Sequence, residues 1–228
     1  MEQYNAVDIL QSKEVATSTL GKTYLYLFTG FLTMAIGGFA GLIGATQLLA
    51  NVGSLGFFLI AIIAQIAFIF LTLKNTYNFM GVVFYYLFTI SVGFFDGPIF
   101  ALILSSPFML KIFGQALVLT TFVTFGLSLY VLITKKDFSY LSGTIFTLLL
   151  VIIGLSVIGI FVHNNTFHLL LSGASAFIFG LFILYDTSKL VREKTHPLAA
   201  AIGLFLDIIN LFWSIFRILL ILSGGRDE

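Results

Sequence analysis

Apolar residues dominate seven stretches of this chain, and polar residues gather in the short segments between them. The stretches cover about residues 23–48, 54–73, 79–105, 112–134, 141–162, 166–188 and 199–222. An α-helix needs about 20 apolar residues to cross the hydrocarbon core of a bilayer. The short alternating segments typical of a transmembrane β-barrel do not occur. The pattern therefore predicts an all-α membrane protein, a bundle of seven transmembrane helices.

The composition agrees with this prediction. Of 228 residues, 59% are hydrophobic and only 9% are charged, more apolar surface than a water-soluble domain of this size can bury. Residues 138–185 contain no Asp, Glu, Lys or Arg. We expect one transmembrane domain over 23–222, with a polar cytosolic tail over 1–22 and a short polar tail over 223–228. The chain is an integral multi-pass membrane protein whose first partner is the lipid bilayer.

Charge and cysteine content exclude several functions. The net charge is +1 without a dense basic cluster, so no nucleic-acid partner is expected. The absence of cysteine excludes disulfides, thiol catalysis and Cys-ligated metals.

The basic residues between the spans predict the orientation. Eight lie on the N-terminal side of the predicted membrane and two on the other side: Lys13, Lys22, Lys74, Lys135, Lys136, Lys189, Arg192 and Lys194, against Lys111 and Arg226. Because basic residues are enriched in cytosolic loops, we expect a cytosolic N-terminus and a C-terminus outside.

Two carboxylates inside the last two apolar stretches are the main candidates for chemistry. The midpoint of Asp186 and Asp207 in the sequence falls between His196 and Pro197, at the predicted turn, so two antiparallel helices would place them at one membrane level. Intramembrane acids are costly and therefore functional candidates. Two close carboxylates should share a proton, and their oxygens also suit Ca²⁺. We predict a pH latch and cation site here; the alternative for Asp186 is an interfacial position beside Lys189.

Polar residues also form a stripe on the seventh span. Asp207, Asn210, Ser214 and Arg217 share one helix face, which predicts a central seventh helix with a pathway-lining face. The alternative is a hydrogen-bonded packing seam.

A third intramembrane acid, Asp96, precedes Gly97 and Pro98 in the third span. Gly97 and Pro98 predict a helix kink. We predict an outer ion pair between Asp96 and Arg217; the alternative is that Arg217 extends to the outer interface.

Small residues recur at four-residue spacing in three spans. The pairs are Gly37 with Gly41, Gly93 with Gly97, and Ala176 with Gly180. This spacing allows neighbouring helices to approach closely, and we interpret it as packing.

Several motifs resemble the Bax inhibitor family, the transmembrane Bax inhibitor motif proteins. They are "LYDTSKL" (184–190), "LDIINLFWSIFRILLILSGGR" (206–226), "GPI" (97–99) and "TYLYLFTGFLT" (23–33), and the resemblance, to a bacterial member, covers nearly the whole chain. It implies a seventh helix surrounded by six others and a pH-sensitive Ca²⁺ leak whose acid pair maps onto Asp186 and Asp207. Relatives in animals and plants restrain cell death, and some bacterial ones interact with a membrane-bound AAA protease.

Together these observations favour a pH-sensitive calcium (cation) leak channel in the bacterial inner membrane, opened by higher pH. The expected ligands are Ca²⁺ and protons, with no cofactor and no enzymatic activity. The alternatives are a non-transporting regulator of membrane proteins or of a membrane protease, a proton-coupled carrier, and an intramembrane aspartyl protease. The last requires Gly-x-Gly-Asp, whereas the chain reads Gly-Leu-Phe-Leu-Asp over 203–207.

Overall fold

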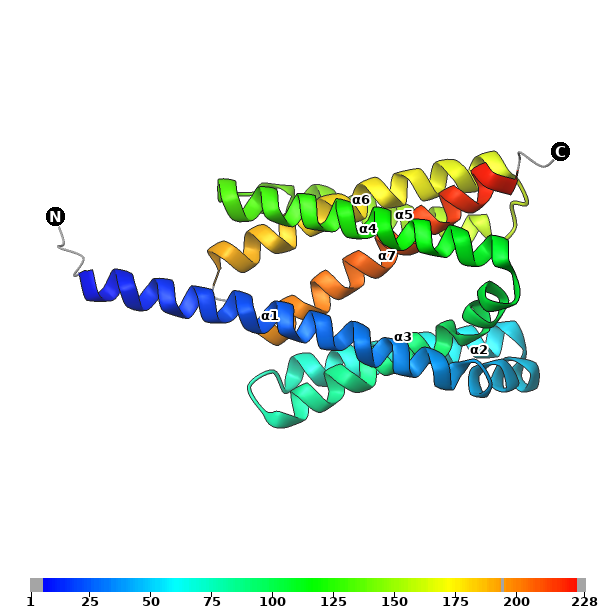
Figure 1. Cartoon of the computed structure of the whole chain (residues 1–228), viewed down its shortest axis with the longest axis horizontal. Coiled ribbons are helices and arrows are strands. Elements are labelled where there is room, and N and C mark those ends of the chain that lie inside the picture. The colour runs from blue at the N-terminus through cyan, green and yellow to red at the C-terminus, as the bar shows by residue number, and fades with distance from the viewer. Residues whose placement is uncertain (1–5, 194, 225–228) are drawn as a thin grey trace. The chain divides into compact units, whose positions relative to one another are not determined.

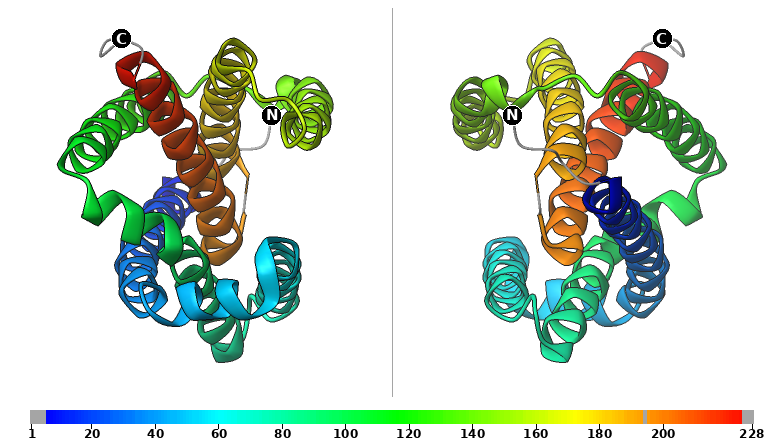
Figure 2. Two further views of the ribbon diagram at one scale, coloured as in Figure 1. Left: turned by 90° about the vertical axis from the view of Figure 1, so that its right-hand side faces the viewer. Right: turned by 90° about the vertical axis from the view of Figure 1, so that its left-hand side faces the viewer.

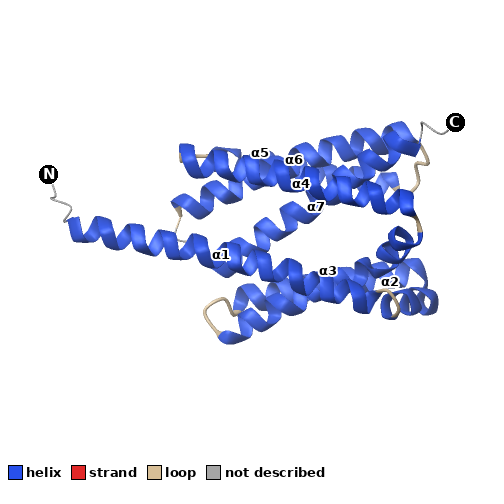
Figure 3. Ribbon diagram, in the orientation of Figure 1, coloured by secondary structure: helices blue, strands red, loops and turns tan. Residues whose placement is uncertain are grey.

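Seven long α-helices and one short 3₁₀-helix account for the fold in the computed structural model (Figure 1). The structure describes residues 6–193 and 195–224, with side chains from Thr19 onward. The elements are α1 (Ala6–Gly41), α2 (Gly44–Lys74), α3 (Phe79–Ser105), α4 (Pro107–Thr134), η1 (Ser139–Leu141), α5 (Ser142–Gly159), α6 (Asn165–Arg192) and α7 (Pro197–Gly224). No strand occurs within the described ranges (Figure 3).

All seven helices are long and apolar enough to cross a membrane. This confirms the predicted all-α membrane protein with seven spans. The orientation of the termini and the central position of α7 stay predictions. Residues 6–22, expected as part of a polar tail, are helical and continuous with α1. In the short C-terminal tail, residues 225–228 lie outside the described residues.

The boundary between the first two spans differs from the prediction. The first span was expected to reach residue 48, but α1 ends at Gly41 and α2 begins at Gly44. The second span was expected to begin at residue 54, and α2 is interrupted just before it, at Gly53. Gly53 has φ +72°, a conformation that glycine adopts without the steric cost of a side chain. Figure 2 shows the two parts of α2 pointing in different directions.

The described chain divides into two compact units. The first contains α1, α2, most of α3 and the beginning of α7, and the second contains α4, α5, α6 and α7 from Leu204 onward.

In the first unit, α1 and α3 touch backbone to backbone. A Cβ atom on Gly37 or Gly41 would collide with the carbonyl oxygen of Ile90 or Phe94. A Cβ atom on Gly97 would collide with the backbone of Gly41. The predicted close approach of helices at these glycines is therefore confirmed.

Hydroxyl groups join the same two helices. The Tyr85 hydroxyl donates a hydrogen bond to the Tyr26 carbonyl at 2.8 Å, and the hydroxyls of Thr33 and Thr89 are 2.7 Å apart. Because helices in a bilayer gain little from hydrophobic association, close packing and such hydrogen bonds stabilise their contact.

In the second unit, α6 contacts both α4 and α5, and α5 lies on the side of α6 that faces away from α4 (Figure 2). The α5–α6 contact contains an apolar cluster built on Ile152, Leu171 and Ile178. A Cβ atom on Gly180 would lie an ordinary 3.5 Å from Leu127 of α4. At this third small-residue pair the close approach of helices is thus less tight than between α1 and α3.

Candidate functional site

The two predicted acids come together in the second unit. Asp186 lies on α6, six residues before its end at Arg192, and Asp207 lies on α7, ten residues after its start at Pro197. Their carboxyl groups are within hydrogen-bonding reach of each other. Two neighbouring carboxyl groups bond in this way when one of them carries a proton, because an ionised carboxylate only accepts. The role of the pair as a pH latch stays a prediction.

The two acids have different surroundings. Asp207 is only 5% exposed, and its Oδ2 atom is buried without a hydrogen-bond partner in the described part of the chain. Asp186 is partly exposed and interacts electrostatically with Lys189 on the next turn of α6. Asp186 thus interacts with both Asp207 and Lys189, and both sequence interpretations of its role stay predictions.

The residues that follow Asp186 fix the end of α6 to other segments. Thr187 is buried, with its hydroxyl 3.4 Å from that of Ser128 on α4. Ser188 is 1% exposed. The Ser188 hydroxyl accepts a hydrogen bond from the Phe138 N–H at 3.0 Å and donates one to the Lys136 carbonyl at 3.2 Å. One buried hydroxyl therefore satisfies two backbone groups of the loop between α4 and η1.

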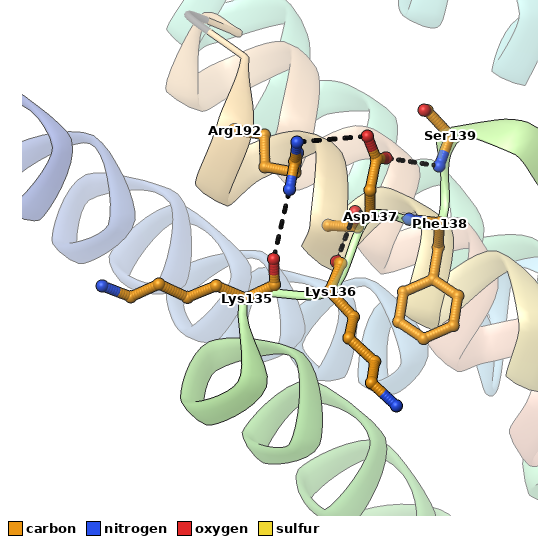
Figure 4. Close-up of polar contacts among 7 residues, drawn as sticks. Lys135, Lys136, Asp137, Phe138, Ser139 and Arg192 are labelled. Carbon is orange, nitrogen blue, oxygen red and sulfur yellow. Dashed lines mark hydrogen bonds and ion pairs between the residues drawn. The ribbon is translucent and has the colours of Figure 1, made fainter.

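Arg192 adds a second attachment to the same loop (Figure 4). Its guanidinium donates to the Lys135 carbonyl at 3.2 Å and lies 3.2 Å from the Asp137 carboxylate. The Ser139 N–H donates to Asp137 at 2.9 Å. Hydrogen bonding from Ser139 and, to a smaller extent, the charge of Arg192 lower the pKa of Asp137. The loop turns sharply because Lys135 adopts a left-handed conformation, φ 52°, directly after α4.

Sequence reasoning missed these attachments. The only local signal is the pair of hydroxyl residues that follows the acid in "YDTSKL" (185–190). Their partners are 50 or more positions earlier in the chain.

The polar stripe of α7 is largely satisfied by its own helix. The Asn210 side chain donates to the Leu206 carbonyl at 2.8 Å, and the Ser214 hydroxyl donates to the Asn210 carbonyl at 2.7 Å. Arg217 is exposed. The lining of a pathway by these residues stays a prediction.

The other predicted residues fall in the first unit. Asp96 lies on α3, where Gly97 contacts Gly41 and the helix continues through Pro98 to Ser105. The predicted kink and the predicted ion pair between Asp96 and Arg217 remain untested.

A permanent metal site is not evident from side chains. Among the described residues, no group of three or more His, Cys, Asp or Glu side chains is placed to hold one ion. Ca²⁺ takes six to eight oxygen ligands, so an ion at Asp186 and Asp207 would also need water or backbone oxygens.

Comparison with known proteins gives the family. Residues 16–224 match the family described as inhibitor of apoptosis-promoting Bax1. The chain belongs to the Bax inhibitor family. The match includes both members of the acid pair and all of α7.

Relatives within the family come from bacteria and from a virus. A membrane protein of Vibrio cholerae is 35% identical over 209 residues, which cover 90% of each chain. A protein of Helicobacter pylori is 32% identical over 223 residues, covering 97% of this chain and 94% of its own. The Golgi anti-apoptotic protein of Vaccinia virus is 41% identical over 107 residues, covering 46% of this chain and 45% of its own.

Proposed function

We propose that this membrane protein of the Bax inhibitor family is a pH-sensitive leak channel for Ca²⁺, controlled by a proton shared between Asp186 and Asp207. The observation that carries the proposal is the pairing of the two carboxyl groups across α6 and α7, with Asp207 buried. Placing two carboxyl groups inside a membrane costs free energy, which argues against a purely structural role for the acid pair. A pair that gains and loses a proton can instead switch the protein between a closed and an open state.

The sign of the pH effect follows from the charges. When the pair holds a proton, one carboxyl donates to the other and α6 stays attached to α7. When both carboxyls ionise, they repel each other and provide two anionic oxygen ligands for a cation. Two charges about 4 Å apart interact by about 4 kcal/mol at an effective dielectric constant of about 20. That is close to the roughly 5.5 kcal/mol that reverses a 1:99 population, so higher pH should open the channel.

Ca²⁺ flux into proteoliposomes tests the proposal. Flux should rise from about pH 6 to about pH 8, a range that brackets the ionisation of a buried carboxyl pair. Asp207→Asn should flatten this rise, because an amide can hydrogen-bond to Asp186 but cannot ionise. Asp137→Asn is the matched control, since Asp137 is an exposed acid of the same unit outside the spans. An unchanged pH profile in Asp207→Asn and Asp186→Asn would exclude the latch.

A second candidate function is regulation of other membrane proteins without transport. The viral relative is named for an anti-apoptotic effect and not for transport. A folded protein without flux at any pH would favour this candidate. A membrane-bound protease in the bacterial inner membrane would then be the first partner to test, by co-purification.

A further inference from the structure

A row of hydroxyl groups runs along the buried side of α4. Thr120, Thr124 and Ser128 are spaced four residues apart, which places them on one side of the helix, one turn above another. Thr120 is 4% exposed and Ser128 is 7% exposed. A lipid-facing position is therefore excluded for Thr120 and Ser128.

Two of these hydroxyls differ from other threonines of the protein. Thr121 and Thr134 of the same helix donate to the carbonyl four residues earlier, at 2.8 and 2.7 Å. The buried hydroxyls of Thr120 and Thr124 have no hydrogen-bond partner in the described part of the chain. Buried polar groups are nearly always satisfied, by protein or by ordered water. The two hydroxyls thus point to water or an ion as their partner.

The row faces the helices that carry the acid pair. Ser128 contacts Thr187, the residue directly after Asp186 on α6. Phe113 precedes Thr120 and Thr124 by seven and eleven residues, about two and three turns, and so shares their side of α4. Its ring lies 5.2 Å from the ring of Phe212 on α7. The hydroxyl row therefore lies on the side of α4 that meets α6 and α7.

Asp207 shows the same feature as the row, since its Oδ2 atom is also buried without a partner in the described chain. By contrast, Asn210 and Ser214 give their hydrogens to the backbone of α7. The second unit thus combines an acid pair with two hydroxyl oxygens, those of Thr120 and Thr124, that are available to a ligand. Such oxygen ligands suit water and hard cations.

We propose that Thr120, Thr124 and Ser128 line a hydrated ion route that leads from the acid pair along α4. This inference rests on the proposed leak function and extends it to residues of α4. A cation released from Asp186 and Asp207 would exchange carboxylate oxygens for hydroxyl and water oxygens along this row.

Cysteine labelling tests whether the row is hydrated. The chain contains no cysteine, so a single introduced thiol is a specific reporter. In the full-length protein in liposomes, Thr120→Cys and Thr124→Cys should react with a small charged methanethiosulfonate reagent about tenfold faster than Ile178→Cys, because a dry apolar site suppresses the thiolate. Ile178, 3% exposed, is as deeply buried as Thr120 but lies in the apolar α5–α6 cluster. Equal rates at Thr120 and Ile178 would overturn the proposal.

Valine substitutions test whether the row carries the ion. Thr120→Val and Thr124→Val remove the hydroxyl with little change in shape, and each should lower Ca²⁺ flux at about pH 8 by roughly three- to tenfold, the effect of one lost hydrogen-bonding group. Thr121→Val is the matched control, because that hydroxyl is exposed and already bonded to Leu117. If Thr120→Val and Thr124→Val conduct like Thr121→Val, the ion does not follow this row. A wild-type protein without flux would overturn the leak itself, and the labelling rates would still decide hydration.

Discussion

The buried hydroxyl of Ser188 accepts a hydrogen bond at 3.0 Å from the backbone N–H of Phe138, which lies 50 residues earlier in the chain. Ser188 follows Asp186 by two residues. The contact therefore ties the segment that carries one member of the acid pair to the loop after α4. We expect α6 to keep its place at this end, so that ionisation of the pair displaces α7.

Ser188→Ala should lower the free energy of unfolding by about 1–3 kcal/mol, because it leaves the Phe138 N–H and the Lys136 carbonyl without their partner. Thermal unfolding in detergent measures the effect. Arg192→Gln is the comparison: its ion pair with Asp137 is about half exposed on both sides, and such pairs contribute about 0–1 kcal/mol. A larger loss in Arg192→Gln than in Ser188→Ala would show that the ion pair dominates the attachment.

Asp137 should make stability depend on pH only under acidic conditions. Its pKa is lowered from the ordinary 3.8 by the hydrogen bonds from Ser139 and by Arg192. A group whose pKa is lowered by folding stabilises the folded state at pH values above its pKa in the unfolded chain. This stabilisation is lost as pH falls through its pKa in the folded state. The stability difference between wild type and Asp137→Asn should thus be constant above about pH 5 and shrink below the ordinary Asp value. A difference that grows on acidification would contradict this assignment.

His196, just before α7, should titrate below the ordinary histidine value of 6.5. Burial and, second, the charge of Lys22 lower its pKa. The neutral ring can accept the hydrogen bond that the Leu198 N–H directs at Nδ1 over 3.3 Å. This hydrogen bond should stabilise the start of α7 at pH values above 6.5, the ordinary histidine pKa. It should be lost as pH falls through the lowered pKa of His196. NMR titration of isotope-labelled histidine measures the shift, and Lys22→Gln should move it part of the way back. A pKa above 6.5 in the wild type would refute the assignment.

Gly97→Ala should destabilise the protein by about 1–3 kcal/mol, the usual cost of inserting an atom into a packed contact. The new methyl group would collide with the backbone of Gly41, which cannot rotate away. Gly114→Ala is the matched control, because a Cβ atom at this position of α4 meets nothing within 4 Å. Thermal unfolding of both variants should separate them clearly. Equal stability would mean that α1 and α3 separate easily.

Much of the fold could be predicted from sequence because hydrophobic length alone identifies helices that span a bilayer. The predicted start of the second span at residue 54 directly follows Gly53, where α2 is interrupted, but α2 itself begins earlier, at Gly44. The turn at Leu42 and Ile43 was missed, since both residues are apolar and neither proline nor charge marks the boundary. Helix ends inside an apolar run give no compositional signal.

The candidate site, like the fold, could be predicted from sequence only in part. The expected common level of Asp186 and Asp207 follows from the turn at their midpoint, a local property of the sequence. The contact of Ser188 with the loop after α4 depends on long-range packing. The adjacent residues Thr120 and Thr121 are chemically identical, and only the direction of each side chain from α4 decides that one is buried and the other exposed.

The glycine contact between α1 and α3 restricts how this protein can diverge. Gly41 and Gly97 occupy one shared space, so neither position can accept a larger residue while the helices keep their separation. A substitution on one helix is viable only after the other helix has moved, and that movement also displaces the neighbouring contacts of Gly37 and Gly93. Substitutions at Gly37, Gly41, Gly93 and Gly97 should therefore be coupled, because a larger residue at any one of them changes the separation of α1 and α3 at the other three.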